Sequence, residues 1–278
     1  MLNLIKSEWD KVASLKSTWV ISILSLVMVA GGGTAFCAYM NNRYATSETF
    51  KKMLEREGRT PQIWDYSGIF SSLMIICLVI FAILMVTNEY TFKTINTTLL
   101  ANPNRVKVFS AKAIVVIVYS GIVSLVSLLV SFFLCYAVTP NFHVAFGDEF
   151  SHKILIHLGC TVLAIILLSL MCFAIGFLVK NSAAAIAIFV VFYEVLTGII
   201  QMITAVVGKA WIAILNNCLP GSLANSFMYS GVKGANNSIL SDGSVVKAFT
   251  HVQSFLGLVI WLLILVIPAL ICFKKRDA

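Results

Sequence analysis

Charged residues are scarce in this chain. They make up 12% of its 278 residues, whereas hydrophobic residues make up 59%. A soluble domain usually carries about 25% charged residues, so a water-soluble globular domain is excluded. No nucleic-acid-binding module accompanies the net charge of +8, and we therefore attribute the excess of cations to membrane topology.

Several functional motifs are also missing. The seven cysteines include no C-x-x-C pair and the four histidines are scattered, so neither a metal site nor a disulfide framework is predicted. No G-x-x-x-x-G-K-[ST] phosphate loop occurs, and the chain therefore has no ATP site of that kind. The first apolar run lacks a small-residue cleavage site, so we do not interpret it as a signal peptide.

What the sequence does contain is a set of long apolar runs. A helix needs about 20 apolar residues to cross roughly 30 Å of hydrocarbon, whereas barrel strands alternate and are about half as long. The runs therefore predict an all-α integral membrane protein whose single domain covers residues 1–278. Its six predicted spans are 18–40, 67–87, 113–138, 154–179, 183–207 and 252–273.

The distribution of Lys and Arg predicts which segments face the cytoplasm. If the N-terminus is inside, the inner segments are 1–17, 88–112, 180–182 and 274–278. These segments are denser in cations than the outer ones, so we expect both termini to be cytoplasmic. The inner cations are Lys6, Lys11, Lys16, Lys93, Arg105, Lys107, Lys112, Lys180, Lys274, Lys275 and Arg276.

Residues 1–17 predict a helix that lies flat at the membrane surface. Leu2, Ile5, Trp9 and Val12 recur at helical spacing, which gives the segment one apolar face. Its simplest role is to anchor and orient the first span.

Two stretches interrupt the regular pattern. Gly31–Gly33 weaken the first span and permit a kink or a close neighbour. Residues 211–231, "WIAILNNCLPGSLANSFMYSG", are too apolar for an exposed loop and too broken by Asn216, Asn217 and Pro220 for a span. A re-entrant helical hairpin on the outer side fits, because irregular backbone at membrane depth must be buried in protein or face water.

Polar residues inside the spans have two interpretations. Ser120, Ser124, Ser127 and Ser131 share one face of the third span, and small residues in register allow close helix packing. The alternative is a polar stripe that lines a substrate path.

Glu194 lies near the middle of the fifth span, in "FVVFYEVLTG". An acid at that depth is costly, so it usually faces protein or water and often marks function. It is either a contact for a cationic substrate or proton-sensitive gate, or a neutral or hydrogen-bonded acid that joins helices. With Gln201 and the first three serines, it forms the candidate translocation path: Ser120, Ser124, Ser127, Glu194 and Gln201.

The polar block "TNEYTFKTINTTLLANPNRVKVFSAK", residues 87–112, separates the second and third spans. Its residues from Glu89 onward are compatible with a helix, in which Phe92, Ile95 and Leu99 form a short apolar face. Pro103 disfavours helix at the preceding residue, so the helix is predicted to end near residue 101. The apolar side of this short helix requires a groove, supplied either by lipid or by a partner protein.

Three segments carry a resemblance to a known family. "EWDKVASLKSTW" (8–19), "NEYTFKTINTTLLANPNRVKVFSAK" (88–112) and "LPGSLANSF" (219–227) resemble the permease subunits of ABC-2-type ABC transporters. The middle segment, with its E-Y-x-x-x-T-x-x-T-T-L core, is the most specific. The predicted spans and termini also agree, so the resemblance covers essentially the whole chain.

The resemblance implies a role for each irregular segment. Residues 1–17 match the elbow helix, 89–101 the coupling helix that docks into a separate ATPase subunit, and 211–231 the outer re-entrant element. The implied ATPase contacts are Glu89, Tyr90, Phe92, Lys93, Ile95, Asn96, Leu99 and Arg105, with a second inner contact at Lys180, Asn181 and Ser182.

The resemblance also implies an assembly and a cargo. Two permeases, as a homodimer or with a sister chain, join two ATPase subunits that hold the ATP and Mg in a bacterial cell membrane. The cargo is an exported amphipathic compound such as an antibiotic or an antimicrobial peptide, and a lipid or lipid-linked glycan is the alternative. Of the other classes, a membrane-embedded enzyme needs a catalytic constellation that is not evident here, and a passive channel needs no coupling helix.

Overall fold

The computed structural model describes residues 1–49, 52, 71–101, 104–138, 148–229, 238–239 and 245–275. Within these residues, six helical segments are long and apolar enough to span a membrane, which confirms the predicted all-α fold. Two short strands, β1 (Ser238–Ile239) and β2 (Val245–Val246), pair antiparallel beside them. The spans are Lys16–Arg43, Ser71–Thr91, Arg105–Val138, Leu155–Val179, Ser182–Val207 and His251–Lys275.

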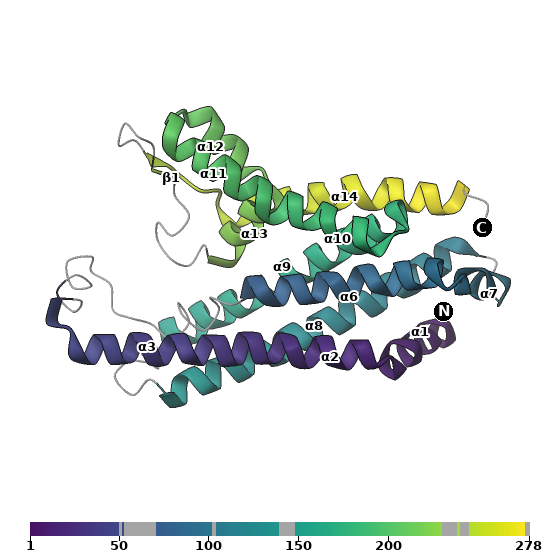
Figure 1. Ribbon diagram of the computed structural model, residues 1–278, viewed down its shortest axis with the longest axis horizontal. Coiled ribbons are helices and arrows are strands. Elements are labelled where there is room, and N and C mark those ends of the chain that lie inside the picture. The colour runs from purple at the N-terminus through teal and green to yellow at the C-terminus, as the bar shows by residue number, and fades with distance from the viewer. Residues whose placement is uncertain are drawn as a thin grey trace.

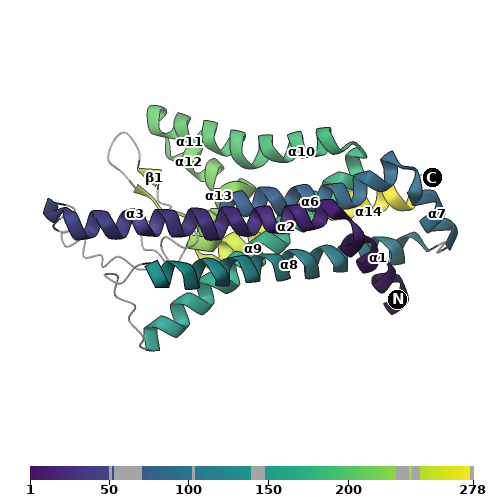
Figure 2. The ribbon, with the colours of Figure 1, turned by 60° about the horizontal axis from the view of Figure 1, so that its bottom comes forward.

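The chain begins with two helices that meet at an angle (Figure 2). Helix α1 (Leu2–Ser14) ends because Leu15 adopts an extended conformation, and α2 (Lys16–Leu26) starts immediately after it. The indole N–H of Trp19 donates to the carbonyl of Ala13 at 3.0 Å across this corner. The predicted surface helix is therefore a separate element that is fixed to the start of the first span.

The glycine-rich part of the first span contains a wider helical turn. A π-helical turn, η1 (Val27–Gly31), separates α2 from α3 (Gly32–Thr46). Such turns occur as local bulges within α-helices. The change of helical pitch thus ends at the first of the three glycines, and Gly32 and Gly33 begin α3.

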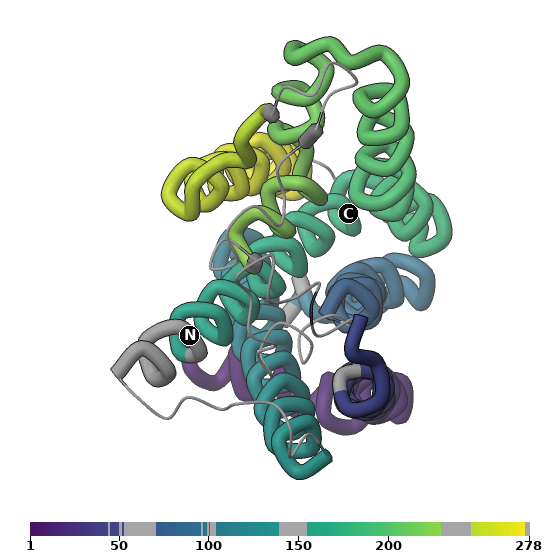
Figure 3. The backbone as a smooth tube through the Cα atoms, turned by 90° about the vertical axis from the view of Figure 1, so that its left-hand side faces the viewer, coloured from purple at the N-terminus to yellow at the C-terminus, as the bar shows by residue number. Residues whose placement is uncertain are grey.

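Helices α6 (Ser71–Thr91) and α9 (Asp148–Val179) form the centre of the bundle, with α8 (Arg105–Val138) and α14 (His251–Lys275) beside them (Figures 1 and 3). The most apolar windows of α6 and of the fourth span are 61% and 67% buried, against 17% for the fifth span and 11% for α14. Gly176 allows close packing of α9 on α6, because a Cβ there would lie 3.3 Å from Cβ of Val86. The peripheral spans therefore leave apolar faces for lipid or another chain.

The fifth span leads into the predicted helical hairpin. It consists of α10 (Ser182–Val190), a second π-helical turn η2 (Val191–Val195) and α11 (Leu196–Val207). The hairpin is α12 (Ala210–Asn217) followed by α13 (Pro220–Tyr229). Proline at the first position of α13 lacks only an N–H that would have no partner within the helix.

The hairpin packs against the spans at two points. The indole N–H of Trp261 in α14 donates to the carbonyl of Cys218 at 2.9 Å. Gly221 lies directly against η2, where a Cβ would be 2.4 Å from the carbonyl oxygen of Tyr193 and 2.8 Å from Oγ1 of Thr197. Only glycine fits at this position without a shift of backbone.

Replacement of Gly221 tests this contact. Gly221→Ala forces α13 away from η2, and we expect it to lower the free energy of unfolding by about 1–3 kcal/mol, measured by thermal unfolding in detergent. Gly198→Ala is the matched control, because a Cβ at Gly198 meets nothing within 4 Å. Equal unfolding midpoints for the two variants would contradict the close approach of α13 to the fifth span.

Candidate functional site

The N-terminus, the C-terminal end of α14 and the short helix α7 (Thr94–Ala101) gather at one end of the bundle (Figure 1). These are the segments in which the sequence concentrates its predicted inner cations. The candidate site is therefore this end of the molecule, with α7 at its tip.

The polar block folds differently from the single helix predicted over 89–101. Helix α6 continues to Thr91, and a turn at Phe92 and Lys93 separates it from α7. Lys93 has a φ of 55°, a left-handed conformation that ends the helix, and its N–H donates to the carbonyl of Tyr90 at 3.2 Å. Glu89 and Tyr90 thus belong to the last turn of the second span, and only α7 projects from the bundle.

The apolar face of this helix also needs correction. Ile95, predicted to share an exposed face with Phe92 and Leu99, is only 7% exposed and packs into the core beside Val86. Phe92 is 73% exposed and Leu100 is 85% exposed. The side chains of Asn96 and Leu99 lie outside the described residues. The projecting apolar pair is therefore Phe92 and Leu100, and Leu100 is not among the residues predicted for this face.

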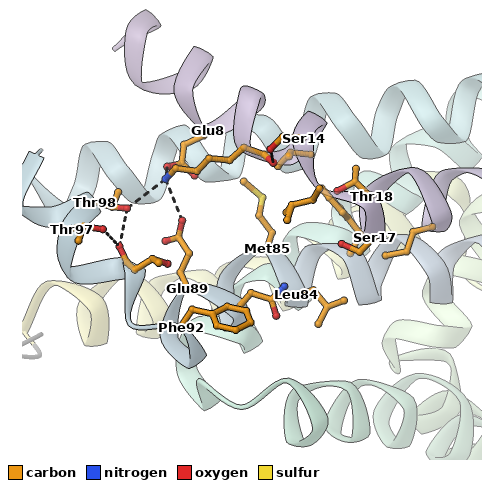
Figure 4. A pocket seen from close by; sticks show the side chains of 17 residues that line it. Glu8, Ser14, Ser17, Thr18, Leu84, Met85, Glu89, Phe92, Thr97 and Thr98 are labelled. Carbon is orange, nitrogen blue, oxygen red and sulfur yellow. Dashed lines mark hydrogen bonds and ion pairs between the residues drawn. The ribbon is translucent and has the colours of Figure 1, made fainter.

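A buried ionic network holds the base of α7. Nζ of Lys112, on α8, lies 2.5 Å from Oε2 of Glu8 on α1 and 2.6 Å from Oε1 of Glu89 on α6. The side chains of Lys112 and Glu8 are both 1% exposed. Nζ of Lys11 lies 2.7 Å from Oε1 of Glu8 and 3.4 Å from Oγ1 of Thr98 on α7 (Figure 4). We call Glu8, Lys11, Glu89 and Lys112 the inner ion network; it joins α1, α6 and α8, and Lys11 extends it to α7.

The network keeps two of its members charged at neutral pH. Burial by itself raises the pKa of Glu8, but the charge of Lys112 and hydrogen bonds from Lys11 and Lys112 outweigh it and hold this pKa below its ordinary value of 4.5. Burial by itself lowers the pKa of Lys11, but its hydrogen bond with Glu8 and the charges of Glu8 and Glu89 raise it above 10.5. Both shifts favour the ion-paired state.

The burial of one member of the network, Glu8, could have been predicted from the sequence. Glu8 follows Ile5 by three residues and precedes Val12 by four, so it lies on the apolar face of the first helix. An acid on a face that becomes buried needs a cation. The identity of that cation, Lys112, depends on a contact across 104 positions of sequence, which local patterns do not reveal.

Aromatic rings pack together between four helices at the same end of the bundle as α7. Phe177 of α9 lies at the centre, with ring centroids 5.0 Å from Phe109 of α8, 4.9 Å from Phe273 of α14 and 6.2 Å from Tyr90 of α6. Arg105, a predicted ATPase contact, is half-buried, and its Nη1 donates to the carbonyl of Phe273 at 3.1 Å. Arg105 therefore ties the start of α8 to the end of α14.

The predicted second inner contact lies beside this cluster. Nζ of Lys180 is 4.8 Å from the ring centroid of Tyr90, a cation–π distance. Oδ1 of Asn181 accepts from the N–H groups of Ala183 and Ala184 and caps α10, which begins at Ser182. The structure thus brings Lys180 to the last turn of the second span.

The candidate path residues fall into two separate groups. Ser120, Ser124 and Ser127 are buried on α8, whereas Glu194 and Gln201 are exposed on the fifth span. Figures 1 and 2 place α8 and the α10–α11 segment on opposite sides of the bundle, so this chain alone does not bring the groups together.

The serine face packs against the first span. The next serine of the same face, Ser131, donates to the carbonyl of Val29 in η1 at 3.2 Å, and Ser120 donates to Val116 of its own helix at 2.7 Å. This arrangement favours the packing interpretation. Because Glu194 is exposed within a membrane helix, it requires protein or water beyond this chain.

Comparison with known proteins identifies one family. A family model described as "ABC-2 family transporter protein" matches residues 4–197. The match includes α1, α7 and all four members of the inner ion network, and it ends within the fifth span, before the α12–α13 hairpin. No curated protein matches the sequence.

Removal of the buried cation tests the inner ion network. Lys112→Met leaves Glu8 and Glu89 without their main counter-charge, and we expect it to lower the free energy of unfolding by about 3–5 kcal/mol, measured by thermal unfolding in detergent. The triple variant Glu8→Gln, Glu89→Gln, Lys112→Met should recover most of this loss, because no buried unpaired charge remains and Lys11, which is 46% exposed, can be hydrated. Lys107→Met is the control, since Lys107 is exposed on the same helix. Unchanged stability of Lys112→Met would refute the network's role.

The network also predicts an acid transition. Because the pKa of Glu8 is lowered on folding, its contribution is present above 4.5 and is lost as the pH falls through the folded pKa. We expect α1 to detach from α6 and α8 when the pH falls below the folded pKa of Glu8. Hydrogen exchange of residues 2–14, corrected for its intrinsic pH dependence, should show this step in the wild type and not in Glu8→Gln. The same acid profile in both proteins would count against the assignment.

Proposed function

The chain belongs to the ABC-2 family of transporter proteins, and we propose that it is the membrane-spanning permease of an exporter for an amphipathic compound. In this proposal its helices form the translocation path, and a separate ATPase subunit binds ATP and Mg. The choice of cargo, such as an antibiotic or an antimicrobial peptide, follows the family likeness rather than any residue of the site.

The observation that carries the proposal is the pair of exposed apolar side chains at α7, Phe92 in the turn before this helix and Leu100 near its end. Phe92 and Leu100 are 73% and 85% exposed at the end of the bundle where both termini lie. Burial of one large apolar side chain contributes about 1.5–3 kcal/mol, so two such side chains in a cleft of a partner support a stable contact. An ATPase subunit with such a cleft is the partner that the family implies.

The internal contacts of α7 supply a route for coupling. A helix of eight residues is not stable alone, and α7 is instead held by α6, by α8 and by the inner ion network. The aromatic cluster and Arg105 extend this connection to α9 and α14. We expect a push on α7 by a closing ATPase pair to move the inner ends of these spans as one body.

The exposed residues of the peripheral spans support the presence of a second permease. The fifth span and α14 are the least buried of the six, and Glu194 requires a protein or aqueous environment. A homodimer or a pair with a sister chain supplies both. In such a pair, Glu194 and Gln201 face either the other permease or the path between the two.

Substitution of the exposed pair tests the docking role of α7. Phe92→Asp and Leu100→Asp place a charge in an apolar contact, and we expect each to reduce the ATPase that co-purifies with the permease by about tenfold or more. The ATPase is sought among the phosphate-loop proteins of the same genome, and the amount recovered is measured on affinity-purified permease.

Leu2→Asp is the matched control for this experiment. Leu2 is 83% exposed at the same end of the bundle but belongs to α1, so this substitution should leave ATPase recovery unchanged. Membrane fractions must contain equal amounts of all three variants. If the ATPase remains bound to both Phe92→Asp and Leu100→Asp, docking through α7 and the turn before it is ruled out.

A further inference from the structure

A cavity of about 420 Å³ lies between the first two helices and the corner of α6 and α7. Figure 4 shows side chains of α1 and α2 on one wall and those of α6 and α7 on the other. Cavities of roughly 300–1,000 Å³ are typical of small-molecule sites. Some of its lining residues, Phe92 and members of the inner ion network, also belong to the coupling proposed above, but that proposal assigns no ligand to the space between them.

The one ammonium group that lines the cavity has no proton left for a ligand. An ammonium has three N–H donors, and Nζ of Lys11 lies 2.7 Å from Glu8, 3.4 Å from Glu89 and 3.4 Å from Thr98. Lys112 lies behind these carboxylates and does not line the cavity. The charges of the inner ion network balance, so hydrogen-bond polarity rather than net charge selects the ligand.

Several hydroxyl groups of the lining also present acceptors. Ser14 donates its proton to the carbonyl of Lys11 at 2.8 Å, and Thr97 and Thr98 donate theirs to the carbonyl of Thr94 at 2.7 and 3.2 Å. A hydroxyl has one proton and two acceptor lone pairs. The lining also contains donors, the amide of Asn88 and the hydroxyls of Ser17 and Thr18. The charged groups beside Lys11 are the carboxylates of Glu8 and Glu89, however, and together with the three hydroxyl acceptors they favour a ligand that donates hydrogen bonds.

We propose that this cavity binds the protonated primary amine of an amphipathic cation. An ammonium brings three donors and no acceptor, which complements the polar part of the lining, whereas an anionic ligand brings none. The apolar part of the ligand lies against the remaining wall, which includes Ile21, Phe81, Leu84 and Met85. Such a ligand contacts α1 and α7 together.

Any effect of occupancy on ATP hydrolysis rests on the proposed function, but binding does not. The test therefore uses the full chain without an ATPase, in phosphatidylcholine nanodiscs, so failure of transport and failure of binding are distinguishable. Radiolabelled dodecylamine should bind saturably after subtraction of its uptake by empty nanodiscs. Dodecanol should compete at least about tenfold more weakly, because a neutral hydroxyl donates one weaker hydrogen bond, and dodecanoate should not compete.

Two variants locate the binding. Met85→Trp fills the cavity, and the double variant Thr97→Val, Thr98→Val removes two acceptors at nearly constant shape; each should weaken amine binding by about tenfold. Leu125→Trp is the control, because Leu125 is exposed on α8 and does not line the cavity. Wild-type affinity in Met85→Trp, or equal competition by dodecanoate and dodecylamine, would overturn the proposal.

A further experiment, with a second lipid in the nanodiscs, identifies the source of the amine. Phosphatidylethanolamine carries the same primary ammonium on a lipid headgroup. Loss of dodecylamine binding in nanodiscs that contain this lipid identifies the headgroup as the occupant, and unchanged binding identifies a soluble amine. Absence of saturable dodecylamine binding in phosphatidylcholine nanodiscs rejects both.

Discussion

The arrangement of the inner end depends on one buried lysine. Lys112 is 1% exposed and contacts carboxylates from two other helices, Glu8 on α1 and Glu89 on α6. A buried charge is tolerated only when it is paired, so these three helices must meet at this point. Helix α1, the second span and the third span are thereby fixed together, although the two carboxylates lie 104 and 23 positions from Lys112 in sequence.

The position of α7, at the exposed end of the molecule, depends on this contact. Helix α7 is too short to be stable alone, and it is connected to α6 by a tight turn at Lys93 and to the network through Thr98. Phe92 and Leu100 are therefore displayed on a rigid base rather than on a free loop. A rigid base is what force transmission from an ATPase requires, and the same base forms one wall of the proposed amine site.

Hydrophobic patterning predicted the large features of the fold. Six spans, the surface helix and the α12–α13 hairpin follow from the length and interruption of apolar runs. Details of the site did not follow. The turn after α6 uses a left-handed lysine where a glycine would be the usual signal, and Ile95 is buried by residues far away in sequence. The sequence predicts that Arg105 is an exposed cation, yet its side chain donates a hydrogen bond to the carbonyl of Phe273 at the end of α14. The misses at Ile95 and Arg105 are long-range contacts that override a local pattern, whereas the miss at Lys93 is a local turn made by an unusual residue.

The central claim is that a separately encoded ATPase binds α7. The most direct test is a structure of the assembled complex, determined in a lipid bilayer with a non-hydrolysable ATP analogue. The account predicts that Phe92 and Leu100 lie inside a cleft of the ATPase, on the cytoplasmic side, while Lys112 remains between Glu8 and Glu89. A complex in which α7 is immersed in lipid, or faces the opposite side of the membrane from the ATPase, would contradict it.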